Sequence, residues 1–307
     1  MDKEILNMAK EGDPLAQLNV GLYYLLEKGD DKQGCQWLQK SAEQGNSDAQ
    51  FSLGMCYYNG CGTEENSDEA LKWFLKAAEQ DHPEAMFYIG SFYTRGESVE
   101  QDTVKAFSWL LRAAELGELK SQFDVGLLYL SGKGVEQDME AALYWLLQAS
   151  EGGDPKAQYY VGLCINNGYG TEPDTEAALE WFQAAANQGH AKAQFYVGLY
   201  YHEKSKDSEA VEWFRKAAEQ GVAAAQVELG MFYNRGRGVK RNFQKAFQWF
   251  LKAAEQGNAE AQCHVGICYE NGVGARENLK EAAKWYRLSA EQGDEIAQAR
   301  LNYISDL

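Results

Sequence analysis

The chain offers few groups that could do chemistry, and none stands in a catalytic arrangement. A serine nucleophile, a zinc peptidase or a phosphate-binding loop would each leave a short motif. The sequence contains no Ser-x-x-Lys, Lys-Thr-Gly, Gly-x-Ser-x-Gly, His-Glu-x-x-His or Walker motif. Paired carboxylates such as Glu64 and Glu65 fall in polar loop sequence, where a solvated turn explains them. We therefore expect no catalytic residue, no enzyme activity and no cofactor.

Cysteine and histidine are the residues that could hold a metal, but their spacing does not favour it. No Cys-x-x-Cys pair occurs among the six cysteines. Cys56, Cys164 and Cys268 occupy a position that holds Leu, Phe or Tyr in other copies of the repeated pattern below, so each behaves as a small apolar residue. His82 and His190 occupy equivalent places at the start of predicted helices. We expect no metal site and no disulfide framework.

A Gly-x-Gly pair before a helix can indicate a nucleotide site. Here the pair recurs between two helical patterns and follows no strand pattern, so we interpret the glycines as turn residues that supply positive φ. The pairs are Gly60 and Gly62, Gly132 and Gly134, Gly168 and Gly170, Gly236 and Gly238, and Gly272 and Gly274.

All of these residues belong to one pattern that is repeated about eight times. Successive tryptophans are 36 residues apart except for one gap of 32. A fixed period of this length is typical of a solenoid, in which each unit buries its apolar face by stacking on its neighbours. The tryptophans are Trp37, Trp73, Trp109, Trp145, Trp181, Trp213, Trp249 and Trp285.

Each copy predicts two helices, here named helix A and helix B. In helix A, Ala49, Leu53 and Tyr57 recur four residues apart and share a face. Gly54 lies beside that face, and a glycine inside a helix costs about 1 kcal/mol relative to alanine. We expect a neighbouring backbone or a tryptophan to approach it closely. Helix B carries Trp73 in a wide apolar stripe and stops at a Gln-Gly pair.

The sequence predicts one array over residues 1–307, with an N-terminal cap at 1–12 and a C-terminal cap at 294–307. Two copies lack the glycine loop: residues 27–30 replace it in the first and residues 202–207 in the sixth. In the third copy, Ser98 stands where the second glycine is expected. We expect the short sixth loop to alter the geometry of the array. The predicted repeats are 13–45, 46–81, 82–117, 118–153, 154–189, 190–221, 222–257 and 258–293.

This pattern resembles the Sel1-like repeat, a relative of the tetratricopeptide repeat, over essentially the whole chain. The resemblance rests on the motif Ala-x3-Leu-Gly-x2-Tyr, followed by Gly-x-Gly and then by Ala-x2-Trp-(Phe/Leu)-x2-Ala-Ala-x2-Gly. The resemblance implies an all-α, right-handed α/α superhelix whose helices A line a concave surface. It also implies a non-catalytic adaptor, of the kind found in quality control, bacterial signalling, host contact and secretion loci. Cysteine-rich members are linked to β-lactam binding, but this chain lacks their regular cysteine pair.

Two positions of helix A are the candidates for partner binding. The variable slot, just before the aliphatic-Gly pair, holds Asn, Ser, Tyr, Asp, Glu or His, and four residues later comes the apolar slot. The two share a helix face, and aromatic residues mixed with acids favour protein binding. The apolar slot has an alternative interpretation as core between the helices. The predicted concave stripe contains Tyr88, Phe92, Asp124, Tyr160, Tyr196, Tyr200, Glu228 and Phe232.

Charge narrows the class of partner. A formal net charge of −17 argues against nucleic acid, and it is compatible with a basic partner or with simple solubility. One segment of the chain is basic although the chain as a whole is acidic. It is a secondary candidate for docking of a partner; alternatively it is a solvated loop. No apolar run is long enough to span a membrane and the start is charged, so we expect a cytoplasmic protein. The basic residues are Arg235, Arg237, Lys240 and Arg241.

The sequence therefore favours a bacterial adaptor that binds a partner protein or peptide on its concave surface. One alternative is a cytosolic immunity protein that neutralises a secreted antibacterial toxin or effector. Another is a binder of small ligands or cell-wall fragments, which would need a deep polar pocket.

Overall fold

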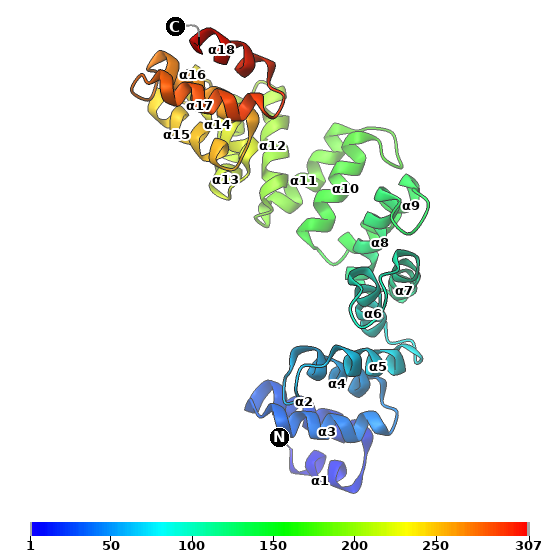
Figure 1. The fold of residues 1–307 in the computed structure, drawn as a ribbon. Coiled ribbons are helices and arrows are strands. Elements are labelled where there is room, and N and C mark those ends of the chain that lie inside the picture. Colours follow the sequence, from blue (N-terminus) through cyan, green and yellow to red (C-terminus); the bar gives the residue numbers. More distant parts are fainter. Residues whose placement is uncertain (1, 306–307) are drawn as a thin grey trace. The chain divides into compact units, whose positions relative to one another are not determined.

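The computed structural model describes residues 2–305, and this part of the chain is helical, with no strand. Residues 1, 306 and 307, which include the end of the predicted C-terminal cap, lie outside the described residues. Eight helix pairs follow one another between a first helix, α1 (Lys3–Glu11), and a last helix, α18 (Glu295–Ser305). Figure 1 shows the pairs in chain order, from blue to red. The all-α solenoid predicted from the sequence is confirmed.

Helix A of each pair is about thirteen residues long in most repeats. In the first repeat a short π-helix, η1 (Tyr24–Lys28), extends it. The helices A are α2 (Pro14–Tyr23), α4 (Ser47–Asn59), α6 (Pro83–Arg95), α8 (Leu119–Ser131), α10 (Pro155–Asn167), α12 (Ala191–Glu203), α14 (Ala223–Arg235) and α16 (Ala259–Asn271).

Helix B of each pair carries the tryptophan and the double alanine of the pattern. The helices B are α3 (Asp31–Glu43), α5 (Ser67–Ala78), α7 (Thr103–Glu115), α9 (Met139–Ser150), α11 (Thr175–Asn187), α13 (Asp207–Glu219), α15 (Phe243–Glu255) and α17 (Leu279–Ala290).

The chain forms two compact units, and each has its own hydrophobic core. One unit comprises residues 1–152 with 169–171, and the other comprises 153–168 with 172–307. Within each unit, helices that follow one another along the chain pack extensively against each other, as in a solenoid. Fully buried Phe74 and Phe92 lie in the core of the first unit, and Phe214 and Leu229 in that of the second.

The glycine inside helix A makes room for a side chain of helix B. A Cβ added to Gly198 would lie 2.6 Å from Phe214, and one added to Gly230 would lie 2.6 Å from Phe250. The expected close approach of a backbone is confirmed, because a Cβ on Gly54 would lie 3.3 Å from the Ala70 carbonyl oxygen. The approaching side chain, however, is that of the residue after the tryptophan, so the expectation of a tryptophan at this place was wrong. The reason is that helix B turns the residue after the tryptophan toward helix A, while Trp213 and Trp249 remain half-buried.

The glycine loops are turns with positive φ, as predicted. Gly236 ends α14 at φ 70°, and Gly238 follows at φ 60°. A Cβ on Gly238 would lie 2.3 Å from the carbonyl oxygen of Asp207, the first residue of the preceding helix B. Ser98, which replaces this glycine in the third repeat, also adopts a positive φ of 56°. Each such loop therefore covers the start of a helix B that lies 31 residues earlier, as Gly134 does over Thr103.

A ladder of glutamines links successive repeats. Gln226 Nε2 donates to the Ala218 carbonyl oxygen at 3.0 Å, and Gln256 Nε2 donates to Gln226 Oε1 at 2.8 Å. In the fourth repeat, Gln122 Nε2 makes the first of these bonds, at 3.2 Å. Its Oε1 is buried without a hydrogen-bond partner among the described residues. The reason is that Gly152 stands where the donor glutamine belongs, 30 residues later.

Replacing Gly152 by glutamine should therefore stabilise the first unit by about 1 kcal/mol, because a net hydrogen bond contributes about 0.5–1.5 kcal/mol. The new Cβ would lie 2.5 Å from Leu119 Cδ1, the end of a side chain that is 46% exposed and can rotate away. Urea denaturation followed by circular dichroism measures the change. Gly152→Ala is the control because it adds a side chain without the amide. If both variants have the same stability, the missing ladder bond has no energetic role.

Candidate partner-binding surface

The variable slot carries rings that rest on the preceding helix B. In the second unit, Tyr196 of α12 stacks on Phe182 of α11, with ring centroids 4.8 Å apart and planes 20° apart. In the first unit, Tyr88 of α6 stacks on Phe74 of α5 at 5.2 Å and 21°. Both tyrosines are half-buried, and so is Tyr160 of α10. Stacking buries one face of each ring, and further rings contact both tyrosines: the ring centroid of Tyr58 lies 5.7 Å from that of Tyr88, and that of Tyr159 lies 5.9 Å from that of Tyr196. Only the part of each side chain that remains exposed is available to a partner.

Two residues of the variable slot are partly buried carboxylates. Burial raises the pKa of Asp124 in α8 to about 6, and Glu118 adds to this effect. Burial also raises the pKa of Glu228 in α14, with a smaller contribution from Glu260, while His202 and Arg235 partly offset the rise. Neither carboxylate makes a hydrogen bond or a salt bridge to another residue of the described range. A cation from outside would therefore relieve an unfavourable charge at each position.

The apolar slot proved to be mostly core, so part of the predicted stripe was wrong. Phe92 is 0% exposed and Phe232 is 3% exposed, and both belong to hydrophobic cores. Cys164 is buried in the same way. The physical reason is that this position of helix A faces the interior between the two helices of its repeat. Tyr200 differs, because it is half-buried and its hydroxyl donates to the Glu176 carboxylate.

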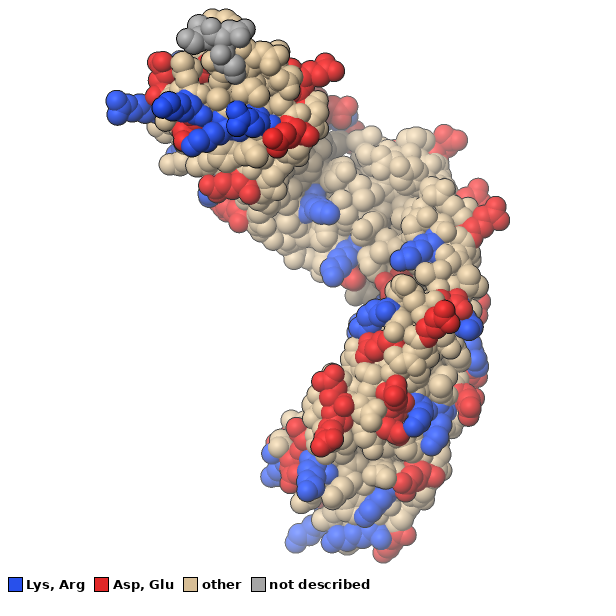
Figure 2. Space-filling model, viewed as in Figure 1, with Lys and Arg blue, Asp and Glu red and all other residues tan. Residues whose placement is uncertain are grey.

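The basic segment of the seventh repeat is partly neutralised by acids. Arg237 Nε donates to Asp207 Oδ2 at 3.0 Å. Arg235 lines a pocket of 230 Å³ together with Glu228 and Glu260. Figure 2 shows basic and acidic side chains interspersed over much of the visible face, with a row of basic ones over the C-terminal helices. The four candidates Arg235, Arg237, Lys240 and Arg241 are exposed.

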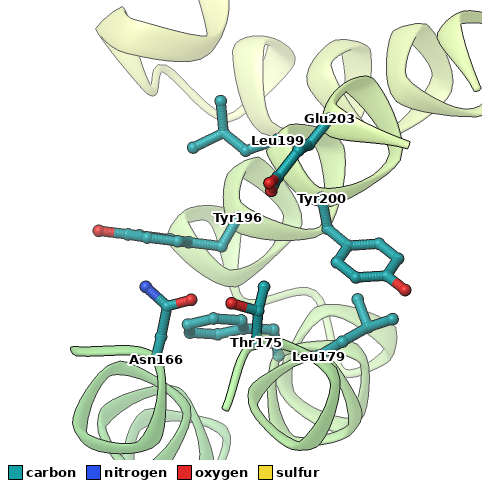
Figure 3. Close-up of a pocket in the computed structure, with 8 residues that line it drawn as sticks. Asn166, Thr175, Leu179, Tyr196, Leu199, Tyr200 and Glu203 are labelled. Atoms are coloured by element: carbon teal, nitrogen blue, oxygen red, sulfur yellow. The ribbon is translucent and has the colours of Figure 1, made fainter. Parts of the chain in front are cut away.

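A second pocket, of 180 Å³, lies between α11 and α12. Phe182, Leu179, Leu199 and the rings of Tyr196 and Tyr200 form most of its lining. Figure 3 shows the Glu203 carboxylate directed between the two tyrosines, with Thr175 and Asn166 on the opposite side. Both pockets are smaller than the roughly 300–1,000 Å³ of typical small-molecule sites. Their size suits a single side chain.

The cysteines and histidines that were considered for metal or redox chemistry lie in surroundings typical of structural residues. Within residues 2–305, no group of three or more His, Cys, Asp and Glu residues could hold a metal ion. Burial raises the pKa of the Cys164 and Cys268 thiols to about 11, so they stay protonated at neutral pH. His82 and His190 cap helices: Nδ1 accepts from the Ala85 and Ala193 amides at 3.3 and 3.2 Å. This agrees with their prediction as helix-start residues.

Comparison with known proteins agrees with the repeat. The Sel1 repeat model matches most of the chain, at residues 14–46, 47–82, 83–118, 119–154, 155–190, 191–222, 223–258 and 259–294. The chain belongs to the Sel1 repeat family. A Sel1 repeat protein from Oxalobacter formigenes is 31% identical, with a TM-score of 0.73, over 98% of this chain and 89% of that one.

A protective antigen of uropathogenic Escherichia coli with the same fold is 29% identical to this Sel1 array, with a TM-score of 0.68. The match covers 98% of this chain and 74% of the antigen. A search of the curated proteins gave no match. Sel1 repeats usually mediate protein interactions and are generally non-catalytic. No helix in the described range of this Sel1 array combines the length and the apolar character needed to cross a bilayer.

Sequence reasoning identified the variable slot but missed the pocket between α11 and α12. The available signal was the loss of four residues from the sixth repeat, which we had interpreted only as a change in array geometry. A shorter loop leaves uncovered a surface that the loop covers in other repeats.

Proposed function

We propose that this Sel1 array is a non-catalytic interaction module that binds a basic segment of a partner protein along its helices A. The observation that carries this proposal is a pair of half-buried carboxylates, Asp124 in the first unit and Glu228 in the second, neither of which makes a hydrogen bond or a salt bridge within the described residues. Each lies in the variable slot, which carries stacked tyrosines in other repeats.

Energetics supports a basic partner over a neutral one. A carboxylate that is partly removed from water without a counter-ion destabilises the free protein, and a lysine or arginine of a partner would remove that cost. Tyrosine next to such a charge supplies contact area and a hydrogen-bonding group. The net charge of −17 would also attract a basic partner over longer distances at low salt.

The proposal is tested by affinity capture from the native cell lysate, followed by mass spectrometry. The baits are the wild type, the isosteric double variant Asp124→Asn/Glu228→Gln, and a control, Glu136→Gln/Glu212→Gln, which changes exposed acids outside the slot. We expect a basic protein to be retained by the wild type and the control, and its affinity for the slot variant to fall at least tenfold. The slot variant keeps its fold because it removes charge without changing shape.

The same experiment separates the remaining roles. One basic protein captured in equal amounts would favour neutralisation of a toxin, whereas several weakly bound proteins would favour an adaptor. If the slot variant retains the partner as well as the wild type does, the variable slot is not the binding surface. The exposed basic residues around Arg241 would then be the next site to change.

A further inference from the structure

The sixth repeat leaves a surface open that a loop covers in other repeats. In five repeats the second glycine of the loop packs on the carbonyl of the first residue of the preceding helix B, as Gly170 does on Met139. The equivalent first residue of α11 is Thr175. The loop that would cover it belongs to the sixth repeat, where residues 204–206 alone join α12 to α13. Thr175 is exposed.

The open surface is held in shape by its own contacts. The Tyr200 hydroxyl and Lys204 Nζ both donate to Glu176, the latter at 2.7 Å, and so tie the end of α12 to the start of α11. Tyr196 is fixed by its stacking on Phe182. The resulting pocket of 180 Å³ is preformed, with apolar walls and three polar groups at its rim.

The chemistry of the rim indicates the occupant. Glu203 lines the pocket and makes no hydrogen bond or salt bridge to any residue in the described range. An apolar side chain would fill the pocket but would leave this carboxylate less hydrated and unpaired, which is unfavourable. Asn166 and Thr175 offer further oxygen acceptors. A long cation with an apolar stem matches both the walls and the rim.

We propose that this pocket binds an arginine side chain of the partner segment. The guanidinium has five donors in a planar fork and packs on aromatic faces, whereas a lysine ammonium is a compact charge. The stem would lie along Leu179 and Leu199, and the guanidinium would pack on Tyr196 and reach Glu203 (Figure 3), because the Lys204 ammonium already lies 5.3 Å from the centre of the Tyr200 ring. This assignment rests on the proposed function, and it names the residue that anchors the partner in the second unit.

The test uses the full chain and single-residue probes, so it does not require the partner. Methyl NMR signals of leucine-labelled protein are followed during titration with N-acetyl-arginine amide. The neutral isostere N-acetyl-citrulline amide, N-acetyl-lysine amide and N-acetyl-norleucine amide are titrated in the same way. We expect the arginine probe to shift the Leu179 and Leu199 signals saturably, with at least fivefold higher affinity than any other probe.

Two variants identify the site. Glu203→Gln should weaken binding of the arginine probe at least fivefold and leave binding of the norleucine probe unchanged. Glu212→Gln, which changes an exposed acid of α13, is the matched control. Replacing residues 204–206 by a copy of residues 132–138, the loop of the fourth repeat, should cover Thr175 and abolish binding. If the variant with the replaced loop does not fold, the effect of Glu203→Gln still tests the assignment of the pocket. Equal affinity for lysine or citrulline, or an unaffected Glu203→Gln, overturns the assignment. The proposed function then still stands if the slot variant has lost its partner.

Discussion

Phe214→Ala should lower the free energy of unfolding of the second unit by about 3–5 kcal/mol. Phe214 is 0% exposed, and its ring lies 5.5 Å from that of Phe232 and 5.8 Å from that of Phe195. It also fills the space in front of Gly198, which has no side chain with which to close a cavity. The lost contacts would therefore not be replaced.

Urea denaturation measures this loss, and amide hydrogen exchange locates it. Each repeat of a solenoid contacts only its neighbours, so loss of protection should be largest in α12–α15. Phe243→Ala is the matched control, because Phe243 is 37% exposed and its removal should change stability by less than about 1 kcal/mol. Equal effects of the two substitutions would show that the pairing of Phe214 with Gly198 is not a main source of stability.

Asp124→Asn should stabilise the first unit by up to about 3 kcal/mol at pH 7–8 and should leave stability at pH 3 nearly unchanged. A carboxyl whose pKa rises from 3.8 to about 6 on folding loses this amount when it is ionised, at about 1.4 kcal/mol for each pH unit. The cause is burial, with Glu118 in second place.

The sign follows from proton binding. The folded protein holds this proton more tightly than the unfolded chain does, so the contribution of Asp124 to stability is most favourable below pH 3.8. It is lost as the pH rises through about 6 and stays constant above that value. The difference in unfolding free energy between wild type and variant should follow this curve, because the other titrating groups cancel.

Glu136→Gln, which changes an exposed acid in the same repeat, should show no such curve. A difference between Asp124→Asn and wild type that is independent of pH would mean that Asp124 is not desolvated. If the proposed function holds, the variant will be more stable and bind its partner less well. This is the expected relation at a site where an unfavourable charge is kept for binding.

The sequence by itself determined the helix pairs, their number and the turn residues. This information is local, because each helix and turn is specified within one repeat of 32 to 36 residues and the pattern is then copied. Membership of the variable slot could also be predicted, since the residues there change from repeat to repeat while the neighbouring positions do not.

Only the tertiary structure decided which of these positions face the interior. Phe92 and Tyr200 occupy the same slot of their repeats, yet one is buried and the other lines a pocket. The stacking of Tyr196 on Phe182 and the cover of a loop over the start of an earlier helix both join residues in different helices. Such contacts depend on how helices pack against each other, which the spacing within one helix does not encode. The pocket between α11 and α12 lies where one contact across 31 residues, present in five other repeats, is missing.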